Sequence, residues 1–113
     1  MAYISFQPSD FFSSTIYTGN GTAIGSGGLA VTGVGFQSDF TWIKDRDATQ
    51  GHVLFDAARG ATNILASNSS AAESNNTESL TTWGADGFTL GDKATVNNSG
   101  ADFVSWNWKG GTT

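Results

Sequence analysis

Short apolar runs, separated by glycine-rich and polar segments, make up most of the chain. Several of these runs alternate with a period of two, and the three-and-four spacing of an amphipathic helix is scarce. Short β-branched or aromatic runs with turn residues between them are typical of sandwiches and barrels. The pattern therefore predicts an all-β protein, an antiparallel β-sandwich or jelly-roll of short strands. The predicted strands are residues 3–6, 14–18, 29–34, 40–44, 52–56, 62–67, 87–91 and 101–109.

The last predicted strand, ADFVSWNWK, alternates clearly. Val104, Trp106 and Trp108 share one face, because successive side chains of a strand point to opposite sides. The other face carries Phe103 and two polar residues. We expect the face with the two tryptophans to enter the core, and we assign both tryptophans a structural role.

The predicted strand FTWIK has apolar residues on both faces. Phe40 and Trp42 share one face, and Thr41 and Ile43 share the other. A strand of this kind suits the centre of a sheet, or a sheet with a second covered surface. Trp42 is therefore also expected to be structural.

The segment 67–86 is polar and of low complexity until Leu80 and Trp83. We expect a long polar surface loop here, with a helical turn over the letters TESL as the alternative. Residues 110–113 are expected to form a flexible tail or linker. The length of 113 residues favours a single domain over 1–113.

The net charge of −5 and the pI of 4.3 argue against nucleic-acid binding, which needs clustered basic residues. No apolar stretch approaches the ~20 residues of a membrane span, so no membrane insertion is expected. The absence of cysteine excludes disulfides and thiolate chemistry. No signal peptide is visible at the N-terminus.

Charged residues cluster in WIKDRDATQGHVLFDAARGAT, which also holds the only histidine. His52 and Asp56 lie four residues apart on a predicted strand, which separates them by roughly 13 Å and prevents a base–orienter hydrogen bond. No Gly-x-Ser-x-Gly motif is present. We therefore predict no catalytic residues, and expect Asp56 and Arg59 to pair across a tight turn as a structural tie.

Asp45 and Asp47 alternate as the carboxylates of some calcium loops do, and they are the candidate metal ligands. Calcium is the only cofactor that the sequence leaves open. No complete EF-hand is present, since the twelfth position of a loop starting at Asp86 is Asn97 rather than glutamate. Ion pairing of the two aspartates with neighbouring basic side chains is the alternative that we favour.

A glycosidase would need a pair of carboxylates, and the two glutamates, Glu73 and Glu78, both lie in the polar segment. Precise placement of a catalytic pair is difficult there. Trp83 lies in the same segment, and its indole is the candidate for an exposed contact with a sugar ring.

The chain resembles a family of small domains found in tail-fibre and other virion-surface proteins of tailed bacteriophages. The resemblance covers nearly the whole chain in the family's order, and it implies a concanavalin- or laminin-G-like β-sandwich with a non-enzymatic structural or adhesive role. The stretches that carry it are YTGNGTA (17–23), VTGVGFQSDFTWIKDRD (31–47), HVLFDAARGAT (52–62), SNSSAAE (67–73), DGFTLG (86–91) and FVSWNWKGG (103–111).

These features lead us to expect a non-enzymatic virion structural protein, a tail-fibre or receptor-binding module on the virion surface. Its expected partners are other virion proteins, further copies of itself and a host surface glycan. A trimer is expected because fibres generally close with three-fold symmetry. Two alternatives stay open: a capsid decoration (cement) protein, and a carbohydrate-binding, lectin-like module.

Overall fold

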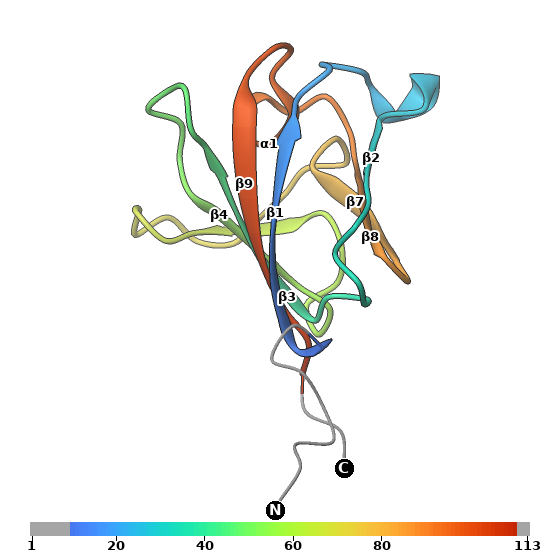
Figure 1. The fold of residues 1–113 in the computed structure, drawn as a ribbon. Coiled ribbons are helices and arrows are strands. Elements are labelled where there is room, and N and C mark those ends of the chain that lie inside the picture. Colours follow the sequence, from blue (N-terminus) through green and yellow to red (C-terminus); the bar gives the residue numbers. More distant parts are fainter. Residues whose placement is uncertain (1–9, 111–113) are drawn as a thin grey trace, which may run out of the picture.

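Two antiparallel sheets face each other in the computed structural model, which describes residues 10–110 (Figure 1). The larger sheet has the order β1-β9-β3-β4-β5-β6, and the smaller has the order β2-β8-β7. The predicted all-β sandwich is confirmed. The strands are β1 (Phe12–Thr18), β2 (Leu29–Val31), β3 (Phe40–Asp45), β4 (Val53–Asp56), β5 (Asn63–Ala66), β6 (Ser74–Asn75), β7 (Leu80–Gly84), β8 (Gly87–Leu90) and β9 (Asp102–Trp108), with a 3-10 turn η2 (Ile24–Ser26) and a short helix α1 (Ala94–Asn97).

Seven of the predicted strands are present, with boundaries that shift by three residues at most, and the one over 3–6 lies outside the described residues. The expected loop over 67–86 was wrong in part, because β6 and β7 form within it. Leu80 is completely buried and pairs β7 with β8, so tertiary contacts override the polar composition. Of the predicted tail, Gly110 donates its N–H to the Asp39 carboxylate, and residues 111–113 lie outside the described part.

The two faces of β9 are the reverse of the expectation. Phe103 is completely buried, and so are the two polar residues on its side of the strand, Ser105 and Asn107. Trp106 and Trp108 lie half-exposed on the outer face of the large sheet. The prediction that the Val–Trp–Trp face enters the core was therefore wrong.

A buried polar network explains why this end of the core accepts small polar side chains. The Thr41 hydroxyl lies 2.8 Å from Ser38 Oγ and 2.9 Å from Asn107 Oδ1. The Asn107 amide nitrogen donates to the Ser13 carbonyl at 3.1 Å and lies 3.1 Å from Ser105 Oγ. Because buried polar groups are tolerated once they are hydrogen-bonded, this network fills space that bulky indoles would otherwise occupy.

The apolar core lies between the two sheets and is centred on completely buried side chains from both. Phe55 and Phe103 from the large sheet are the largest of the completely buried side chains, and Leu90 from the small sheet is also completely buried. The remaining core residues are Val31, Val34, Phe36, Ile43, Val53, Ile64, Leu80, Phe88, Val96 and Ala101.

Strand β3 is central, as its two apolar faces predicted. It pairs with β9 on one side and with β4 on the other. Thr41 and Ile43 are completely buried, whereas Phe40 and Trp42 are half-exposed on the outer face. The sheet therefore carries apolar side chains on both faces, and only one of those faces is covered by the second sheet.

The segment between β2 and β3 closes one end of the sandwich. Gly33 and Gly35 donate their N–H groups to the two carboxylate oxygens of Asp86, at 3.0 and 2.7 Å. Both glycines have positive φ angles, 88° and 93°, which other residues rarely adopt. The two N–H groups lower the pKa of Asp86.

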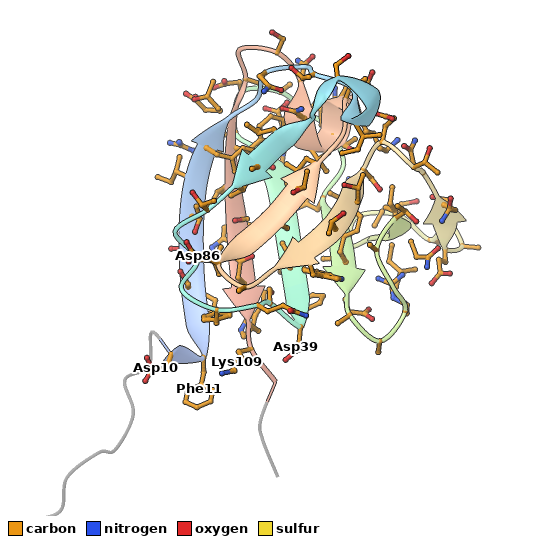
Figure 2. All side chains as sticks on the ribbon, turned by 90° about the vertical axis from the view of Figure 1, so that its right-hand side faces the viewer. Asp10, Phe11, Asp39, Asp86 and Lys109 are labelled. Atoms are coloured by element: carbon orange, nitrogen blue, oxygen red, sulfur yellow. The ribbon has the colours of Figure 1, made fainter. Side chains whose placement is uncertain are left out.

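At the end where β1 begins and β9 finishes, Lys109 Nζ lies 6.0 Å from the centroid of the Phe11 ring (Figure 2).

The Asp56–Arg59 corner follows β4 and connects several segments. Arg59 Nε lies 2.6 Å from Asp56 Oδ2, and Arg59 Nη1 lies 2.9 Å from Glu73 Oε1. The guanidinium also donates to the carbonyls of Leu54 and Asn63. Burial alone raises the pKa of Asp56, but the Arg59 backbone N–H and guanidinium outweigh it and lower that pKa. One side chain thus ties β4, β5 and the segment before β6 together.

The inverted faces of β9 predict opposite responses to two truncations on the same strand. Phe103→Ala should reduce the free energy of unfolding by about 3–5 kcal/mol, because it leaves a cavity in the core. Trp106→Ala should cost about 1 kcal/mol, the size of a cross-strand aromatic pair. Urea unfolding followed by circular dichroism measures both. A loss for Trp106→Ala as large as that for Phe103→Ala would show that the indole lies in the core.

The corner predicts that Arg59→Ala should destabilise the fold by about 2 kcal/mol, because charge-assisted hydrogen bonds and carbonyl partners are lost together. Lys93→Ala is the control, since the described residues provide no hydrogen bond or ion pair to that ammonium group. The pKa of Asp56 is lower in the folded than in the unfolded protein. Its contribution to the free energy of unfolding is therefore fully present above the unfolded pKa and is lost as the pH falls through the folded pKa. The difference in free energy of unfolding between the wild type and Arg59→Ala should therefore become smaller below about pH 4. Equal, negligible losses for the two variants would contradict the tie.

Candidate functional site

Three tryptophans meet on the outer face of the large sheet, on the side away from the second sheet. Trp42 comes from β3, and Trp106 and Trp108 come from the neighbouring β9. Trp42 lies directly opposite Trp106 in the strand pairing, and Trp108 follows two residues later on the same face. We call this set the tryptophan face. All three side chains are half-exposed.

The rings are tilted against one another and enclose a shallow hollow. The centroids of Trp42 and Trp106 lie 5.4 Å apart, with their planes at 64°. Trp108 lies 5.1 Å from Phe12 on one side and 5.1 Å from Phe40 on the other. The three tryptophans alone line an open hollow of about 250 Å³. Rings that support one another edge-on keep fixed orientations, so the hollow is formed before any ligand arrives.

His52 orients one of these rings. Its Nδ1 accepts a hydrogen bond from Trp42 Nε1 at 3.1 Å, so the neutral imidazole carries its proton on Nε2. The two ring centroids lie 5.8 Å apart. The His52 backbone N–H is itself held by the Asn68 side chain. The structure therefore places His52 beside the tryptophan face, and the Asp56 carboxylate is bound to Arg59 instead.

The polar groups left open on the tryptophan face are donors without charge. Among the described residues, the indole N–H groups of Trp106 and Trp108 have no partner and are not enclosed. Lys44, two residues after Trp42 on β3, donates to the carbonyls of Asp45 and Ala48. The face is therefore neutral and aromatic, and it offers N–H donors at its surface.

The apolar surface extends beyond the three tryptophans. In the pairing, Trp42 is opposite Leu54, which is opposite Leu65 on β5. On β1, Phe12 is 41 % exposed and Ile16 is 66 % exposed. Because monomeric proteins rarely leave wide apolar patches open, a surface of this kind marks a place of contact.

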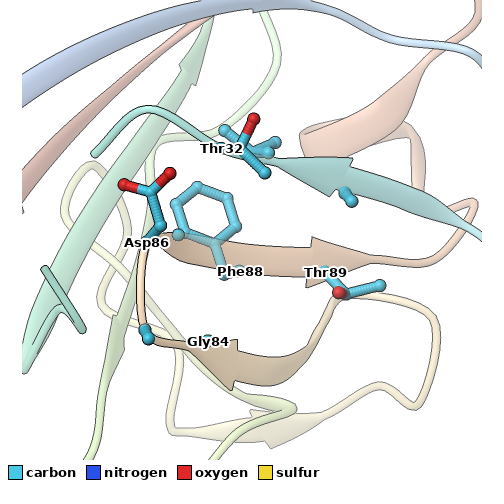
Figure 3. A pocket seen from close by; sticks show the side chains of 9 residues that line it. Thr32, Gly84, Asp86, Phe88 and Thr89 are labelled. Carbon is cyan, nitrogen blue, oxygen red and sulfur yellow. The ribbon is translucent and has the colours of Figure 1, made fainter. Parts of the chain in front are cut away.

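A second hollow, of about 330 Å³, lies between the end of β2 and the β7–β8 turn. Figure 3 shows Asp86, Phe88 and Thr32 around it, together with Gly84 and Thr89. Asp86 is the only titratable residue that lines it, and both of its oxygens already accept backbone N–H groups. This hollow thus offers no nucleophile–base or acid–base pair.

The two candidate calcium ligands, Asp45 and Asp47, accept hydrogen bonds from backbone N–H groups. Asp45 Oδ1 accepts the N–H groups of Asp47 and Ala48, and Asp47 Oδ2 accepts that of Asp102. The remaining Asp45 oxygen is buried without a partner. Residues 10–110 contain no group of three histidine or acidic side chains placed to hold a metal ion. The ion pairs that we favoured for these two aspartates are not formed within residues 10–110, where the ion pairs join Arg59 to Asp56 and to Glu73.

The buried Asp45 carboxylate also affects a neighbouring phenol. Burial, and secondarily the negative charge of Asp45, raise the pKa of Tyr17 well above its usual value. Its hydroxyl donates to the Val96 carbonyl at 2.8 Å. Tyr17 is therefore a neutral structural donor and not a base.

The two glutamates that a glycosidase would use are engaged in structure. Glu73 pairs with Arg59. Glu78 Oε1 accepts the N–H groups of Ile24 and Asp92, at 2.8 and 3.1 Å. Each carboxylate therefore stabilises a turn, and neither lines the tryptophan hollow or the hollow beside Asp86.

Trp83, the expected exposed contact residue, is only partly exposed, and it lies against the core. Trp83 belongs to β7, opposite Phe88, and packs against the core. Its indole nitrogen is buried and finds no partner among the described residues. The polar sequence around it was misleading, because pairing with β8 turns this ring inward.

The tryptophan face was missed by sequence reasoning, although one signal pointed to it. The apolar residues on both faces of FTWIK indicated a second surface to be covered. Combined with the alternation of β9, that signal places Trp42, Trp106 and Trp108 on one side of adjacent strands. What the sequence did not reveal is that the second sheet covers the other side.

Comparison with known proteins gives one match. Residues 7–113 match the family described as a domain of unknown function (DUF7483). Neither the curated proteins nor the solved structures provide a significant match. No helix within residues 10–110 is long and apolar enough to cross a membrane. Since the match spans nearly the whole sequence, the chain belongs to the DUF7483 family.

Proposed function

We propose that the protein is a non-enzymatic module of a bacteriophage virion surface, of the tail-fibre or receptor-binding type, and that the tryptophan face contacts a host surface glycan. The observation that carries the proposal is the exposure of Trp42, Trp106 and Trp108 on one outer sheet face. The placement in a virion rests on the resemblance in sequence to phage surface proteins.

The chemistry of the tryptophan face suits a neutral sugar. The face of an indole ring carries negative electrostatic potential, which attracts the polarised C–H groups of a pyranose. The free N–H groups of Trp106 and Trp108 supply donors for sugar hydroxyls. Tryptophan has few rotatable bonds, and the hydrogen bond to His52 fixes the Trp42 ring further. Binding therefore costs little side-chain conformational entropy.

The non-enzymatic part of the proposal is supported by how the polar groups are used. The carboxylates of Asp56, Glu73 and Asp86 are bound to Arg59 or to backbone N–H groups. The His52 imidazole accepts a hydrogen bond from an indole and forms none with a hydroxyl or carboxylate among the described residues. Groups held in this way stabilise turns and are not poised to exchange protons with a substrate.

Capsid decoration is the second candidate, and the width of the apolar surface favours it. Phe12, Ile16 and Leu54 extend the outer face well beyond a single sugar ring. A cement protein would bury such a face against another virion protein, where aromatic side chains form the centre of the interface. In that case the tryptophan face would contact protein and not glycan.

The glycan proposal predicts that neutral oligosaccharides quench or shift the tryptophan fluorescence of the wild type in a saturable titration. Trp106→Ala should weaken binding roughly 5- to 150-fold, if stacking on the indole contributes the about 1–3 kcal/mol that aromatic stacking contributes for nucleic-acid bases. Trp83→Phe is the matched control, because it changes an indole on the other sheet and should leave the affinity unchanged. Saturable binding that Trp106→Ala leaves intact would place the site elsewhere. Absence of binding across a panel of neutral glycans would refute the glycan contact.

The location on the virion needs a separate measurement. Gold-labelled antibodies against the protein should mark the tails of phage particles in electron micrographs. Labelling of the heads would reject the tail-fibre assignment and support the decoration protein.

A further inference from the structure

Strand β1 is an open edge of the large sheet. It pairs with β9 along all seven of its residues, and within residues 10–110 no strand pairs with its other side. Figure 2 shows it running along one margin of the sandwich. An open edge presents unpaired N–H and C=O groups, and folded proteins usually protect such edges.

The other three edges of the sandwich have protection that β1 lacks. Strands β6 and β2 have only two and three residues, and β7 is interrupted by a bulge between Leu80 and Thr82. Short strands and bulges are common means of preventing edge-to-edge pairing. Strand β1 is regular over seven residues and contains no proline, glycine or charge. The whole segment 11–38 has no charged residue, although the chain carries a net charge of −5.

The direction of the free backbone groups follows from the pairing with β9. The Lys109 N–H donates to the Phe11 carbonyl, and the Gly19 N–H donates to the Ala101 carbonyl. In an antiparallel ladder, the residues that bond to one neighbour alternate with those that point away from it. Odd-numbered residues of β1 therefore face β9. The N–H and C=O groups of the even-numbered residues, Phe12 to Thr18, point to the open side.

We propose that two copies of the chain pair through β1 in an antiparallel arrangement with Ser14 on the two-fold axis. Ser14 then lies opposite Ser14 of the second copy, which is a pairing between residues whose backbone groups both face outward. The same register places Phe12 of each copy opposite Ile16 of the other. These two are among the three exposed large hydrophobic residues of residues 10–110, and an aromatic–β-branched pair across strands is stabilising.

Self-pairing is favoured over an unrelated partner because the strand is complementary to itself. A two-fold axis through Ser14 buries both exposed apolar residues in each copy and opposes no charges. It joins the two large sheets into one, so the two tryptophan faces lie on the same side. One strand pair is a small interface, which predicts weak association rather than an obligate dimer. This two-fold contact is independent of the proposed glycan site, and it differs from the three-fold assembly expected from the resemblance.

A cross-linking experiment tests the register directly. The chain has no cysteine, so Ser14→Cys introduces a single thiol. Across the axis, the two Cα atoms would be about 5.5 Å apart, inside the 4.4–6.8 Å range of disulfides. Oxidation by dissolved oxygen should convert most Ser14→Cys protein to a disulfide-linked dimer. Thr18→Cys is the matched control, since Thr18 is also exposed on β1 but lies roughly 27 Å from its counterpart in this register.

Sedimentation of the uncross-linked protein tests the association itself. The wild type should shift from monomer to dimer as its concentration is raised. Ser14→Lys should raise the dissociation constant roughly tenfold, because it opposes two like charges on the axis, while Thr18→Lys should change it little. Far-ultraviolet circular dichroism checks that each variant is folded, and both substitutions lie at exposed positions.

Three outcomes would overturn the proposal. The first is a wild type that remains monomeric at every concentration. The second is equal cross-linking of Ser14→Cys and Thr18→Cys. The third is a dimer that Ser14→Lys does not weaken. None of these affects glycan binding at the tryptophan face, so the two proposals fail separately.

Discussion

The rest of the structure depends on which side chains of β9 point into the core. This strand lies between β1 and β3 and pairs with both, so its two faces fix which side of the large sheet is inside. A shift of one residue would exchange every inward side chain for an outward one. Phe103 anchors one end of the inner face, and the hydrogen-bonded Asn107 holds the other. Because the Asn107 amide is hydrogen-bonded within the core, the tryptophans that alternate with it on the strand lie on the outer face of the sheet.

Two consequences for function follow from that arrangement. The outer face gathers Trp42, Trp106 and Trp108 from adjacent strands, where no second layer covers them among the described residues. The charged residues that were considered as an active site are used in turns: Arg59 pairs with Asp56 and Glu73, and Asp45 and Asp47 accept backbone N–H groups. The contact surface that we propose is therefore an aromatic sheet face, and the charged residues stabilise turns.

Much of the fold was predictable from alternation and turn residues. The strands over 40–44 and 101–109 were found nearly to their ends, because their period of two is regular. Strand β7 was missed, since the polar residues before Leu80 hide a strand that depends on its pairing with β8. The same dependence misled the assignment of Trp83, whose partial burial comes from pairing with β8 and packing against the core rather than from its neighbours in sequence.

The sequence by itself determined that the protein is an all-β sandwich, that Asp56 and Arg59 lie across one turn, and that segment 11–38 carries no charge. The first depends on the periodicity of apolar residues, the second on the short distance along the chain between Asp56 and Arg59, and the third on composition. Only the tertiary structure decided which face of β9 is covered, that β1 is an unprotected edge, and that three tryptophans form one surface. Alternation gives two faces of equal geometry, and the choice between them depends on which side the second sheet packs against.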